Sequence, residues 1–198
     1  MRIAFLFAAV VAIGAVIGVG LKQASDKQPA GGVPGGIHPS AAKVRDALAG
    51  SPPALASLHA RADQLLPGAK AALQRELKAL KGHPVVVNSW AGWCGPCNVE
   101  APIFQRTALK LGRSVAFLGV NGDDDHGSSM RFRHRYPMSF PSIDDPDKAA
   151  MASLKMTSLP TTAFISAAGK LTITHAGAYI SQAQLEADIR RYAINPPS

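Results

Sequence analysis

The chain has 198 residues, of which 47% are hydrophobic and 6% aromatic, with a formal net charge of +8 and two cysteines. This length suits one domain of about 100–150 residues with additional segments, and it excludes a small fold held together by many disulfides. Two cysteines are also too few for an iron–sulfur cluster or a zinc site built from cysteines alone. The positive net charge alone does not predict nucleic-acid binding, and we favour a solvated basic helix face as its explanation.

The chain begins with a long apolar segment. No charged residue occurs from Ile3 to Leu21, and a helix of this length spans about 30 Å, the thickness of the hydrocarbon core of a bilayer. We favour a membrane anchor in residues 1–21 over a cleaved signal peptide, whose apolar region is usually about 7–15 residues long. Either interpretation places the rest of the chain outside the cytoplasm. The domain is then attached to the cell membrane by a single N-terminal anchor, or secreted if the segment is cleaved.

The next two segments differ from each other in composition. Residues 22–36 combine polar residues with Gly and Pro, which predicts a flexible linker. Residues 37–81 are predicted to form a helical extension, because leucines recur there every three or four positions. These leucines are Leu55, Leu58 and Leu65 in a first helix, and Leu73, Leu77 and Leu80 in a second.

From residue 82 to residue 198 the pattern alternates between strands and helices. Strands are predicted at residues 85–87, 115–120, 162–166 and 171–174, and helices at residues 97–111, 129–136, 147–154 and 181–192. Pro102 is expected to kink the first of these helices, Asp147 to lie near the start of the third, and Ser181 to cap the last. This order predicts an α/β fold with parallel strands first, an antiparallel hairpin last, and helices flanking a central mixed sheet.

Two cysteines lie at the junction between the first strand and the first helix, in Trp93-Cys94-Gly95-Pro96-Cys97. The amino-terminal end of a helix stabilises a thiolate, and a thiol whose pKa falls from about 8.5 to about 7 is roughly half ionised at neutral pH. We therefore predict a redox-active disulfide between Cys94 and Cys97. Cys94 is expected to be the exposed attacking sulfur, and Cys97 the partly buried sulfur that resolves the mixed disulfide.

The stretch VVVNSWAGWCGPCNVEAPIF, residues 85–104, resembles the active-site region of the TlpA/ResA/CcmG branch of thioredoxin-like proteins. Ser158 to Ile165, followed by Gly169-Lys170, resembles the second signature of that family. The resemblance covers roughly residues 82–193 and implies a thioredoxin-like fold. It also implies that Pro160 is a cis-proline facing the cysteine pair and that the neighbouring backbone binds a substrate peptide. The substrate contacts that it implies are Trp93, Gly95, Pro96, Leu159 and Thr161.

Glu100 lies one helical turn beyond Cys97 and on the same helix face. Taken alone, this position favours an exposed glutamate. In the family it resembles, however, a glutamate at this place tunes proton transfer at the buried thiol, and the resemblance implies that role for Glu100. Cytoplasmic thioredoxins carry a buried aspartate six residues before the first cysteine. That place is Asn88 in this chain, and an asparagine cannot accept a proton.

The resemblance implies an extracytoplasmic thiol–disulfide oxidoreductase that acts on proteins. Gly-Pro between the cysteines is the dipeptide of reducing thioredoxins, so we expect a reductase. Electrons would come from a membrane thiol carrier of the CcdA or DsbD type, and apocytochrome c would be a natural target. We expect no cofactor and no metal.

Two alternatives remain open: a copper-handling protein similar to Sco proteins and a thiol peroxidase. None of the six histidines has a spacing that pairs it with Cys94 and Cys97, and a Cys-x-x-Cys pair suits disulfide exchange better than peroxide reduction. Two charged segments, residues 123–126 and 131–135, match no motif. For these we favour a solvated loop and a solvated helix face over a partner-docking patch. Family members often begin with a small β-hairpin, whereas residues 40–81 of this chain are predicted to be helical.

Overall fold

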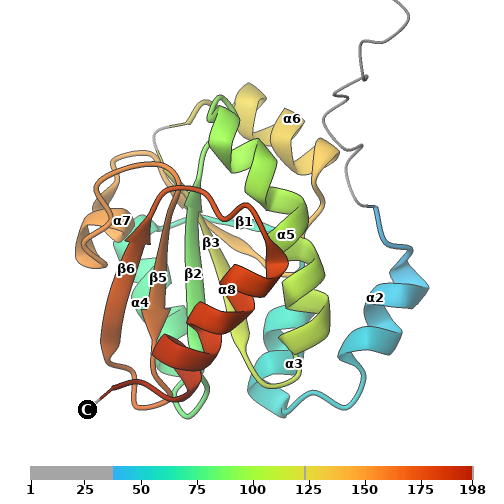
Figure 1. The fold of residues 1–198 in the computed structure, drawn as a ribbon. Coiled ribbons are helices and arrows are strands. Elements are labelled where there is room, and N and C mark those ends of the chain that lie inside the picture. The colour runs from blue at the N-terminus through green and yellow to red at the C-terminus, as the bar shows by residue number, and fades with distance from the viewer. Residues whose placement is uncertain (1–37, 123, 198) are drawn as a thin grey trace, which may run out of the picture. The chain divides into compact units, whose positions relative to one another are not determined.

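The computed structural model describes residues 38–122 and 124–197, which contain a six-stranded sheet in the order β1-β4-β3-β2-β5-β6 with helices on both faces (Figure 1). The strands are β1 (Leu65–Leu66), β2 (Val85–Trp90), β3 (Ala116–Gly122), β4 (Ser142–Asp145), β5 (Thr161–Ile165) and β6 (Leu171–Ala176). The helices are α2 (Ala41–Leu48), α3 (Pro53–His59), α4 (Ala69–Ala79), α5 (Gly95–Leu111), α6 (His126–Arg135), α7 (Ala149–Ser153), α8 (Gln182–Asp188) and the π-helix η1 (Ile189–Ile194).

The predicted anchor and linker, residues 1–21 and 22–36, lie outside the described residues. Within the part of the chain that the structure describes, no helix is both long enough and apolar enough to span a bilayer.

The central strand of the sheet is β2, which is buried along its whole length. It pairs in parallel with β3, where Val85 faces Ala116, and antiparallel with β5, where Val85 faces Ile165. The run of valines at its start suits such a position, because β-branched side chains pack well in a strand covered on both faces. The predicted mixed sheet, with parallel strands first and the antiparallel β5–β6 hairpin last, is confirmed.

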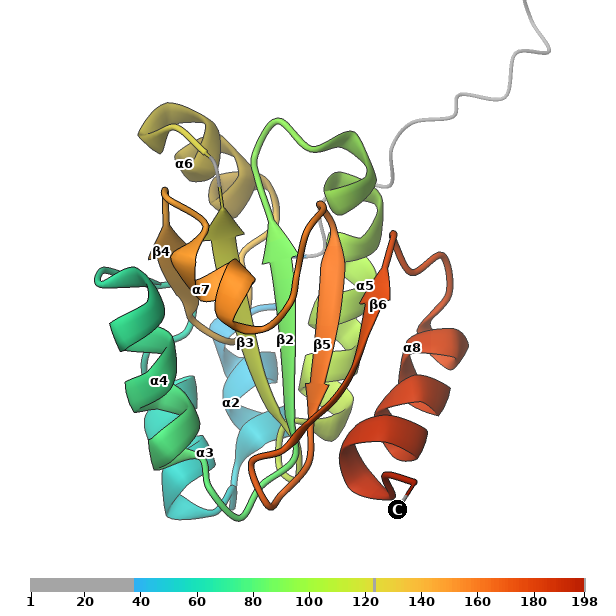
Figure 2. The ribbon, with the colours of Figure 1, turned by 90° about the vertical axis from the view of Figure 1, so that its left-hand side faces the viewer.

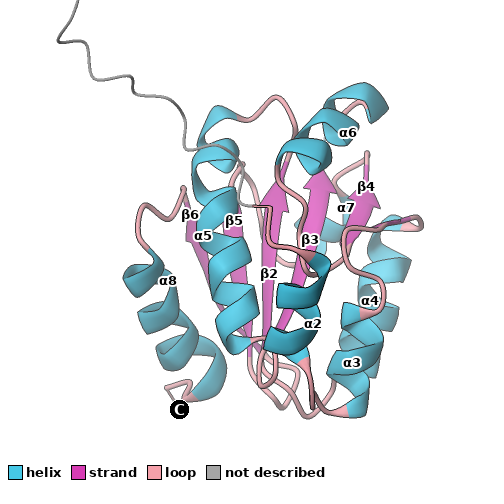
Figure 3. Cartoon of the chain, turned by 90° about the vertical axis from the view of Figure 1, so that its right-hand side faces the viewer, coloured by secondary structure: helices cyan, strands magenta, loops and turns pink. Residues whose placement is uncertain are grey.

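Alternate side chains of β2 enter two separate cores on opposite faces of the sheet. Val85 and Val87 pack with apolar residues of α3, α4 and α7, and Figure 2 shows α4 and α7 on this face. Val86 packs on the other face with Phe104 of α5 and Leu185 of α8, and Figure 3 shows these two helices there. The helices therefore hold β2 from both sides, and the loop after its carboxyl end starts from a rigid base.

The helical extension predicted for residues 37–81 contains α2, α3 and α4, but it also contains a strand. Leu65, which we expected in a helix, lies in β1 and pairs with Ser142 of β4. The strand β4 was not predicted, because Ser-Ile-Asp-Asp contains a single β-branched residue and two aspartates, a residue type that is rare in strands. Through β1 and the buried leucines of α3 and α4, the extension shares the sheet and the core of the following residues.

The acidic residue at the start of α7 differs from the expected one. We expected Asp147, but α7 begins at Ala149, and Asp145 at the end of β4 accepts hydrogen bonds from the amides of Ala150 (2.8 Å) and Met151 (2.9 Å). Asp145 thus satisfies two of the amides that a helix leaves unpaired at its start. Asp145 makes this contact because it is buried at the end of β4. The hydrophobic periodicity of the sequence alone does not reveal such a position.

The remaining helices follow the predictions more closely. Ser181 caps α8, as expected, and its hydroxyl oxygen accepts a hydrogen bond from the amide of Gln184 at 3.2 Å. The helix that we expected to continue to Tyr192 changes into the π-helix η1 after Asp188. The helix α5 continues through Pro102 to Leu111 without interruption.

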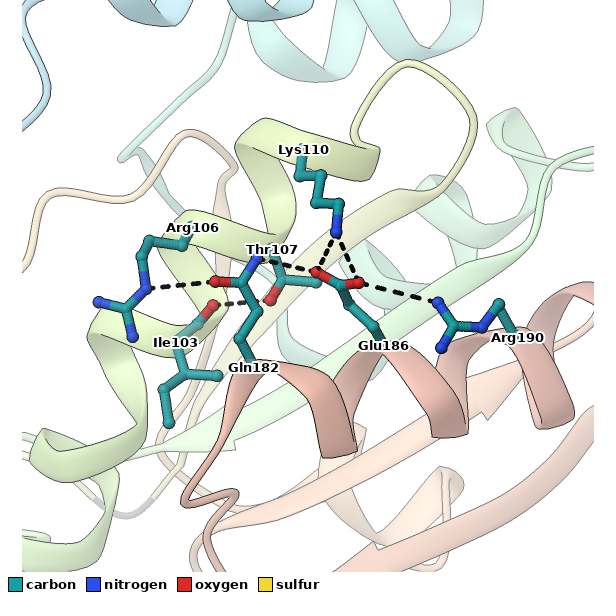
Figure 4. Close-up of polar contacts among 7 residues, drawn as sticks. All are labelled: Ile103, Arg106, Thr107, Lys110, Gln182, Glu186 and Arg190. Carbon is teal, nitrogen blue, oxygen red and sulfur yellow. Dashed lines mark hydrogen bonds and ion pairs between the residues drawn. The ribbon is translucent and has the colours of Figure 1, made fainter.

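A cluster of charged and polar side chains fastens α8 to α5 (Figure 4). Glu186 of α8 accepts hydrogen bonds from Lys110 of α5 at 2.8 Å and from Gln182 at 2.8 Å, and it lies 3.7 Å from Arg190. Beside this cluster, the ring of Tyr179 packs edge-on against Phe104 of α5, with 6.2 Å between ring centres. These contacts fix the loop before α8 against the active-site helix.

Candidate active site

The predicted disulfide between Cys94 and Cys97 is present at the start of α5. Cys94 is the residue that caps the helix, and its sulfur accepts a hydrogen bond from the amide of Cys97 at 3.2 Å. The loop from Ala91 to Trp93 connects this cap to the end of β2. The central strand and the helix that follows it therefore position both sulfur atoms.

The exposure of Cys94 differs from the prediction. In this disulfide form only 3% of Cys94 and 1% of Cys97 is exposed, whereas we expected Cys94 to be open to solvent. The reason is a small apolar cluster in which Phe132 and Tyr136, the latter at the end of α6, pack with both cysteines and Ala101. Trp93, Gly95 and Pro96 beside the disulfide are exposed, as predicted substrate contacts must be.

The peptide bond between Leu159 and Pro160 is cis, as the resemblance implied. Pro160 is buried and Leu159 is half-buried. Thr161, another of the predicted substrate contacts, is buried, and its polar groups bind within the chain. Its amide donates to the hydroxyl of Ser89 at 2.9 Å, its carbonyl accepts from the same hydroxyl at 3.0 Å, and its own hydroxyl donates to the carbonyl of Ser158 at 2.8 Å.

A pocket of about 200 Å³ joins two of the predicted substrate contacts, Trp93 and Leu159. Its other lining residues are Lys148, Met151, Thr157 and Ser158. The pocket thus lies between the loop that carries the first cysteine, the segment that precedes the cis-proline, and α7. A peptide bound along this segment has room there for one side chain.

Glu100 is buried beneath the disulfide rather than exposed as its helix position alone suggested, since only 1% of it is accessible. Its Oε1 accepts a hydrogen bond from the side-chain amide of Asn88 at 2.7 Å, and its Oε2 accepts one from the backbone amide of Tyr179 at 3.0 Å. Burial raises the pKa of Glu100 to about 7, although both hydrogen bonds favour the ionised form. This carboxyl group therefore changes its charge near neutral pH, one helical turn from Cys97.

Sequence reasoning missed Tyr179. Its contribution is a backbone amide, which no side-chain motif reveals. The hydroxyl of Tyr179 donates to Asp188 at 2.7 Å, and its ring stacks on His175 with 4.5 Å between ring centres. Burial, together with the hydrogen bond to Asp188, raises the pKa of Tyr179, so the phenol stays neutral.

The segment from β3 to α6, which we expected to be a solvated loop and helix face, supports the active-site loop. Asp124 accepts hydrogen bonds from the amide of Gly92 at 2.6 Å and from the side chain of Asn121 at 2.9 Å. The aromatic ring of Phe132 on α6 stacks on Trp90 at the end of β2, with 4.3 Å between ring centres. Both contacts hold the residues that precede Cys94.

The described residues contain no group of three or more His, Cys, Asp or Glu side chains that could hold a metal ion. His175, one of the six histidines, stacks on Tyr179. No observation in the described part of the chain therefore favours the copper-handling alternative.

Residues 62–189 match the Redoxin family. The chain belongs to this family. Thiol-disulfide oxidoreductase ResA of Halalkalibacterium halodurans is 30% identical over 108 residues, which are 54% of this chain and 61% of ResA. Thiol:disulfide interchange protein DsbE of Pseudomonas fluorescens biotype C is 32% identical over 102 residues, which are 50% of this chain and 54% of DsbE. The chain thus spans less than two thirds of the length of each.

Among solved structures, the chain is similar to a secreted Mycobacterium tuberculosis disulfide oxidoreductase described as homologous to E. coli DsbE. The identity is 29%, the TM-score is 0.51, and the match covers 57% of this chain and 84% of that one. The Redoxin family and this likeness confirm the thioredoxin-like α/β fold that the two sequence signatures implied.

Proposed function

We propose that this protein is a thiol–disulfide oxidoreductase that reduces disulfides in other proteins outside the cytoplasm. The observation that carries the proposal is the Cys94–Cys97 disulfide at the start of α5, with the cis-Pro160 segment beside it and Glu100 buried behind it. The names of relatives such as ResA and DsbE, which describe thiol–disulfide chemistry, support the same reaction.

In the proposed reaction, the thiolate of Cys94 attacks one sulfur of the substrate disulfide. A mixed disulfide forms, and the other substrate sulfur leaves as a thiolate. The thiolate of Cys97 then attacks the sulfur of Cys94, the Cys94–Cys97 disulfide forms, and the second substrate sulfur leaves. Two electrons pass from the protein to the substrate, whose two thiolates take up protons. The amide of Cys97, already 3.2 Å from the sulfur of Cys94, stabilises the Cys94 thiolate.

Glu100 is the proposed proton acceptor for Cys97. The second attack requires the Cys97 thiol to lose its proton inside the apolar cluster around the disulfide. A carboxyl group with a pKa of about 7 exchanges a proton readily at neutral pH, because the ideal pKa of a general base lies near the working pH. Asn88 and the amide of Tyr179 hold this carboxyl in place through both of its oxygens.

Exposed apolar side chains in the active-site loop, on α5 and α6, and before α8 favour protein substrates over small thiols. Trp93 is 59% exposed, Val99 57% and Met130 of α6 46%. Ile180, which follows Tyr179 in the chain, is 80% exposed. Large exposed apolar side chains are typical of surfaces that bind other proteins.

We extend the proposal to the place and the electron source of the protein. Residues 3–21 would anchor it in the cell membrane, with the domain on the extracytoplasmic face, and a membrane thiol carrier of the CcdA or DsbD type would return the Cys94–Cys97 disulfide to the dithiol. Apocytochrome c is the proposed target. The apolar N-terminal run and the Gly95-Pro96 pair of reducing thioredoxins support this extension.

Reduction of insulin by the dithiol form tests the activity, with Cys94→Ser as the inactive control. Cys97→Ser should leave Cys94 in a stable mixed disulfide with its substrate, which mass spectrometry identifies. A reduction potential near −120 mV, as in DsbA, rather than near about −270 mV, as in thioredoxin, contradicts the reductase assignment. Insulin reduction that persists in Cys94→Ser contradicts the proposed mechanism.

A further inference from the structure

The helix α6 carries an unusual concentration of positive charge directly beside the disulfide. It contains Arg131, Arg133 and Arg135 together with two histidines, and no acidic residue. Neither the proposed chemistry nor the fold accounts for all of these charges. The arginines fall into two groups, which differ in what they contact.

Arg133 serves the fold. It donates a hydrogen bond to the carbonyl of Asp63, lies 3.5 Å from the carboxylate of the same residue, and is thereby neutralised. Arg131 and Arg135 are exposed, and among residues 38–122 and 124–197 neither forms an ion pair with a carboxylate. Arg135 lies over the ring of Tyr136, 5.5 Å from its centre, which directs the guanidinium without cancelling its charge.

The exposed residues of α6 form one stripe. Met130, Arg131, His134 and Arg135 are exposed, whereas Ser128, Ser129 and Phe132 are buried against the domain. The exposed positions lie one turn apart and therefore share a face of the helix. We call these four residues the basic stripe. Two acidic side chains, Asp124 and Asp125, lie before the first turn, at the end of α6 away from Arg135, and accept hydrogen bonds from the amides of Gly92 and Ser128.

The basic stripe is held rigidly with respect to the disulfide. A Cβ atom on Gly92, two residues before Cys94, would lie 2.3 Å from the carbonyl oxygen of Ser128, so the first turn of α6 touches the active-site loop directly. Phe132 stacks on Trp90, and Phe132 and Tyr136 belong to the cluster that surrounds both cysteines. Figure 1 shows α6 beside the amino-terminal end of α5. A protein whose disulfide reaches Cys94 must therefore pass close to these charges.

We propose that the basic stripe on α6 docks an acidic segment that flanks the disulfide of the substrate protein. Charge complementarity carries this inference: two exposed guanidiniums, without a carboxylate partner in the described part of the chain, lie on the helix that packs against the redox site, and Met130 of the basic stripe supplies exposed apolar area. An acidic flank is attracted toward Cys94 before the sulfurs meet, which raises the association rate. This inference rests on the proposed reduction of protein disulfides and names the chemistry of the substrate.

Three synthetic peptides with the same disulfide ring test the proposal. Their flanking residues are glutamates in the first, glutamines in the second and lysines in the third. The bimolecular rate constant for reduction by the dithiol form of the protein is measured at low salt and at 300 mM NaCl. We expect the acidic peptide to react roughly tenfold faster than the neutral one at low salt, with the lysine peptide slowest and the differences shrinking in salt.

Charge reversal locates the effect. Arg131→Glu/Arg135→Glu should abolish or invert the preference, and the milder Arg131→Gln/Arg135→Gln should reduce it without introducing new charges. The matched control is Lys78→Glu/Lys81→Glu, which changes the net charge equally. Lys78 and Lys81 are exposed on and after α4, before the start of β2, whereas the disulfide follows the end of β2. The control should keep the preference of the unmodified protein.

The outcomes separate this inference from the function on which it rests. If the unmodified protein does not reduce even the neutral peptide, the proposed function fails. If it reduces all three peptides at equal rates, the function stands and the docking proposal is overturned. In a last experiment, cosedimentation with phosphatidylserine vesicles measures binding of the protein to a membrane surface. If charge reversal abolishes vesicle binding but leaves the peptide rates unchanged, the stripe faces a membrane surface and the proposal is likewise overturned.

Discussion

The side-chain amide of Asn88 on β2 donates a hydrogen bond of 2.7 Å to the buried carboxyl of Glu100 on α5. The central strand and the active-site helix thus meet in a polar contact directly behind the disulfide. The place that holds a buried aspartate in cytoplasmic thioredoxins holds the donor in this chain, and the titratable carboxyl stands on the helix. The proposed proton acceptor has therefore moved from the strand to the helix.

Replacing Glu100 by Gln should remove the group that titrates near pH 7. We expect the resolving step to slow by on the order of 10², since Cys97 then lacks its proton acceptor, and the inflection near pH 7 in the rate of disulfide exchange should disappear. Stopped-flow measurement of exchange between pH 5 and 9 provides the test. If Glu100→Gln retains the inflection near pH 7, the inflection belongs to another group and the prediction is wrong.

The same substitution changes the pH dependence of stability. The pKa of Glu100 is about 7 in the folded protein and near 4.5 in the unfolded chain, so the folded protein binds this proton more tightly. The resulting stabilisation is complete below pH 4.5 and is lost as the pH rises to 7. It amounts to on the order of 3 kcal/mol. Between pH 4.5 and 8, the free energy of unfolding of the unmodified protein should fall by this amount relative to that of Glu100→Gln. Urea unfolding of both proteins in the disulfide form measures it. Parallel curves for the two proteins contradict the buried titration.

Asn88→Asp should place two carboxyl groups at hydrogen-bonding distance in a buried site. Two such groups cannot both ionise at low cost, so the pair shares a proton and one of its apparent pKa values rises well above 7. We expect this variant to be less stable than the unmodified protein at pH 8 and nearly equal to it at pH 4. Asn88→Ala, which adds no carboxyl, is the control for the lost hydrogen bond. Equal stability of Asn88→Asp and the unmodified protein at pH 8 excludes the coupling.

The parts of the site that could be predicted from the sequence are those carried by local spacing. Cys94 and Cys97 follow a buried strand and begin a helix, and the resemblance to the TlpA/ResA/CcmG branch implied the cis bond before Pro160. The role that it implies for Glu100 stays a proposal. The burial of the two cysteines was not predictable in the same way. It depends on Phe132 and Tyr136, which lie far along the chain and reach the cysteines only through the packing of α6.

Contacts made by the backbone, or by the close approach of two chain segments, have no recognisable pattern in the amino-acid sequence. The amide of Tyr179 binds Glu100, 79 positions earlier in the chain, without help from its side chain. The strand β4 approaches β3 closely at Gly119, where a Cβ atom would lie 2.1 Å from the Ser142 hydroxyl oxygen. Such contacts are decided by neighbours in space, whereas propensity reflects only neighbours in sequence.

Glu186→Gln should weaken the attachment of α8 to α5. Lys110 lowers the pKa of Glu186, so the ion pair stabilises the fold above the usual pKa of a glutamate, and this contribution is lost as the pH falls through the lowered value. The loss at pH 7 should be no more than about 1 kcal/mol, because Lys110 is 58% exposed and solvent screens the pair. A double-mutant cycle with Lys110→Met, followed by urea unfolding at pH 3 and pH 7, measures the coupling. A coupling that is unchanged at pH 3 contradicts the ion pair.

The contact between the active-site loop and α6 is tested by a matched pair of glycine substitutions. Gly92→Ala adds a Cβ atom that would lie 2.3 Å from the carbonyl oxygen and 2.5 Å from the carbonyl carbon of Ser128, so the backbone of α6 must move. Gly95→Ala, only three residues later, adds a Cβ atom with nothing within 4 Å. Overpacking against a backbone costs about 1–3 kcal/mol, whereas an open position at a helix start accepts alanine within about 0.5 kcal/mol. Urea unfolding of both variants in the disulfide form should therefore give a clearly lower free energy of unfolding for Gly92→Ala than for Gly95→Ala. Equal stabilities would mean that α6 yields easily, and the basic stripe would then not be held rigidly beside Cys94.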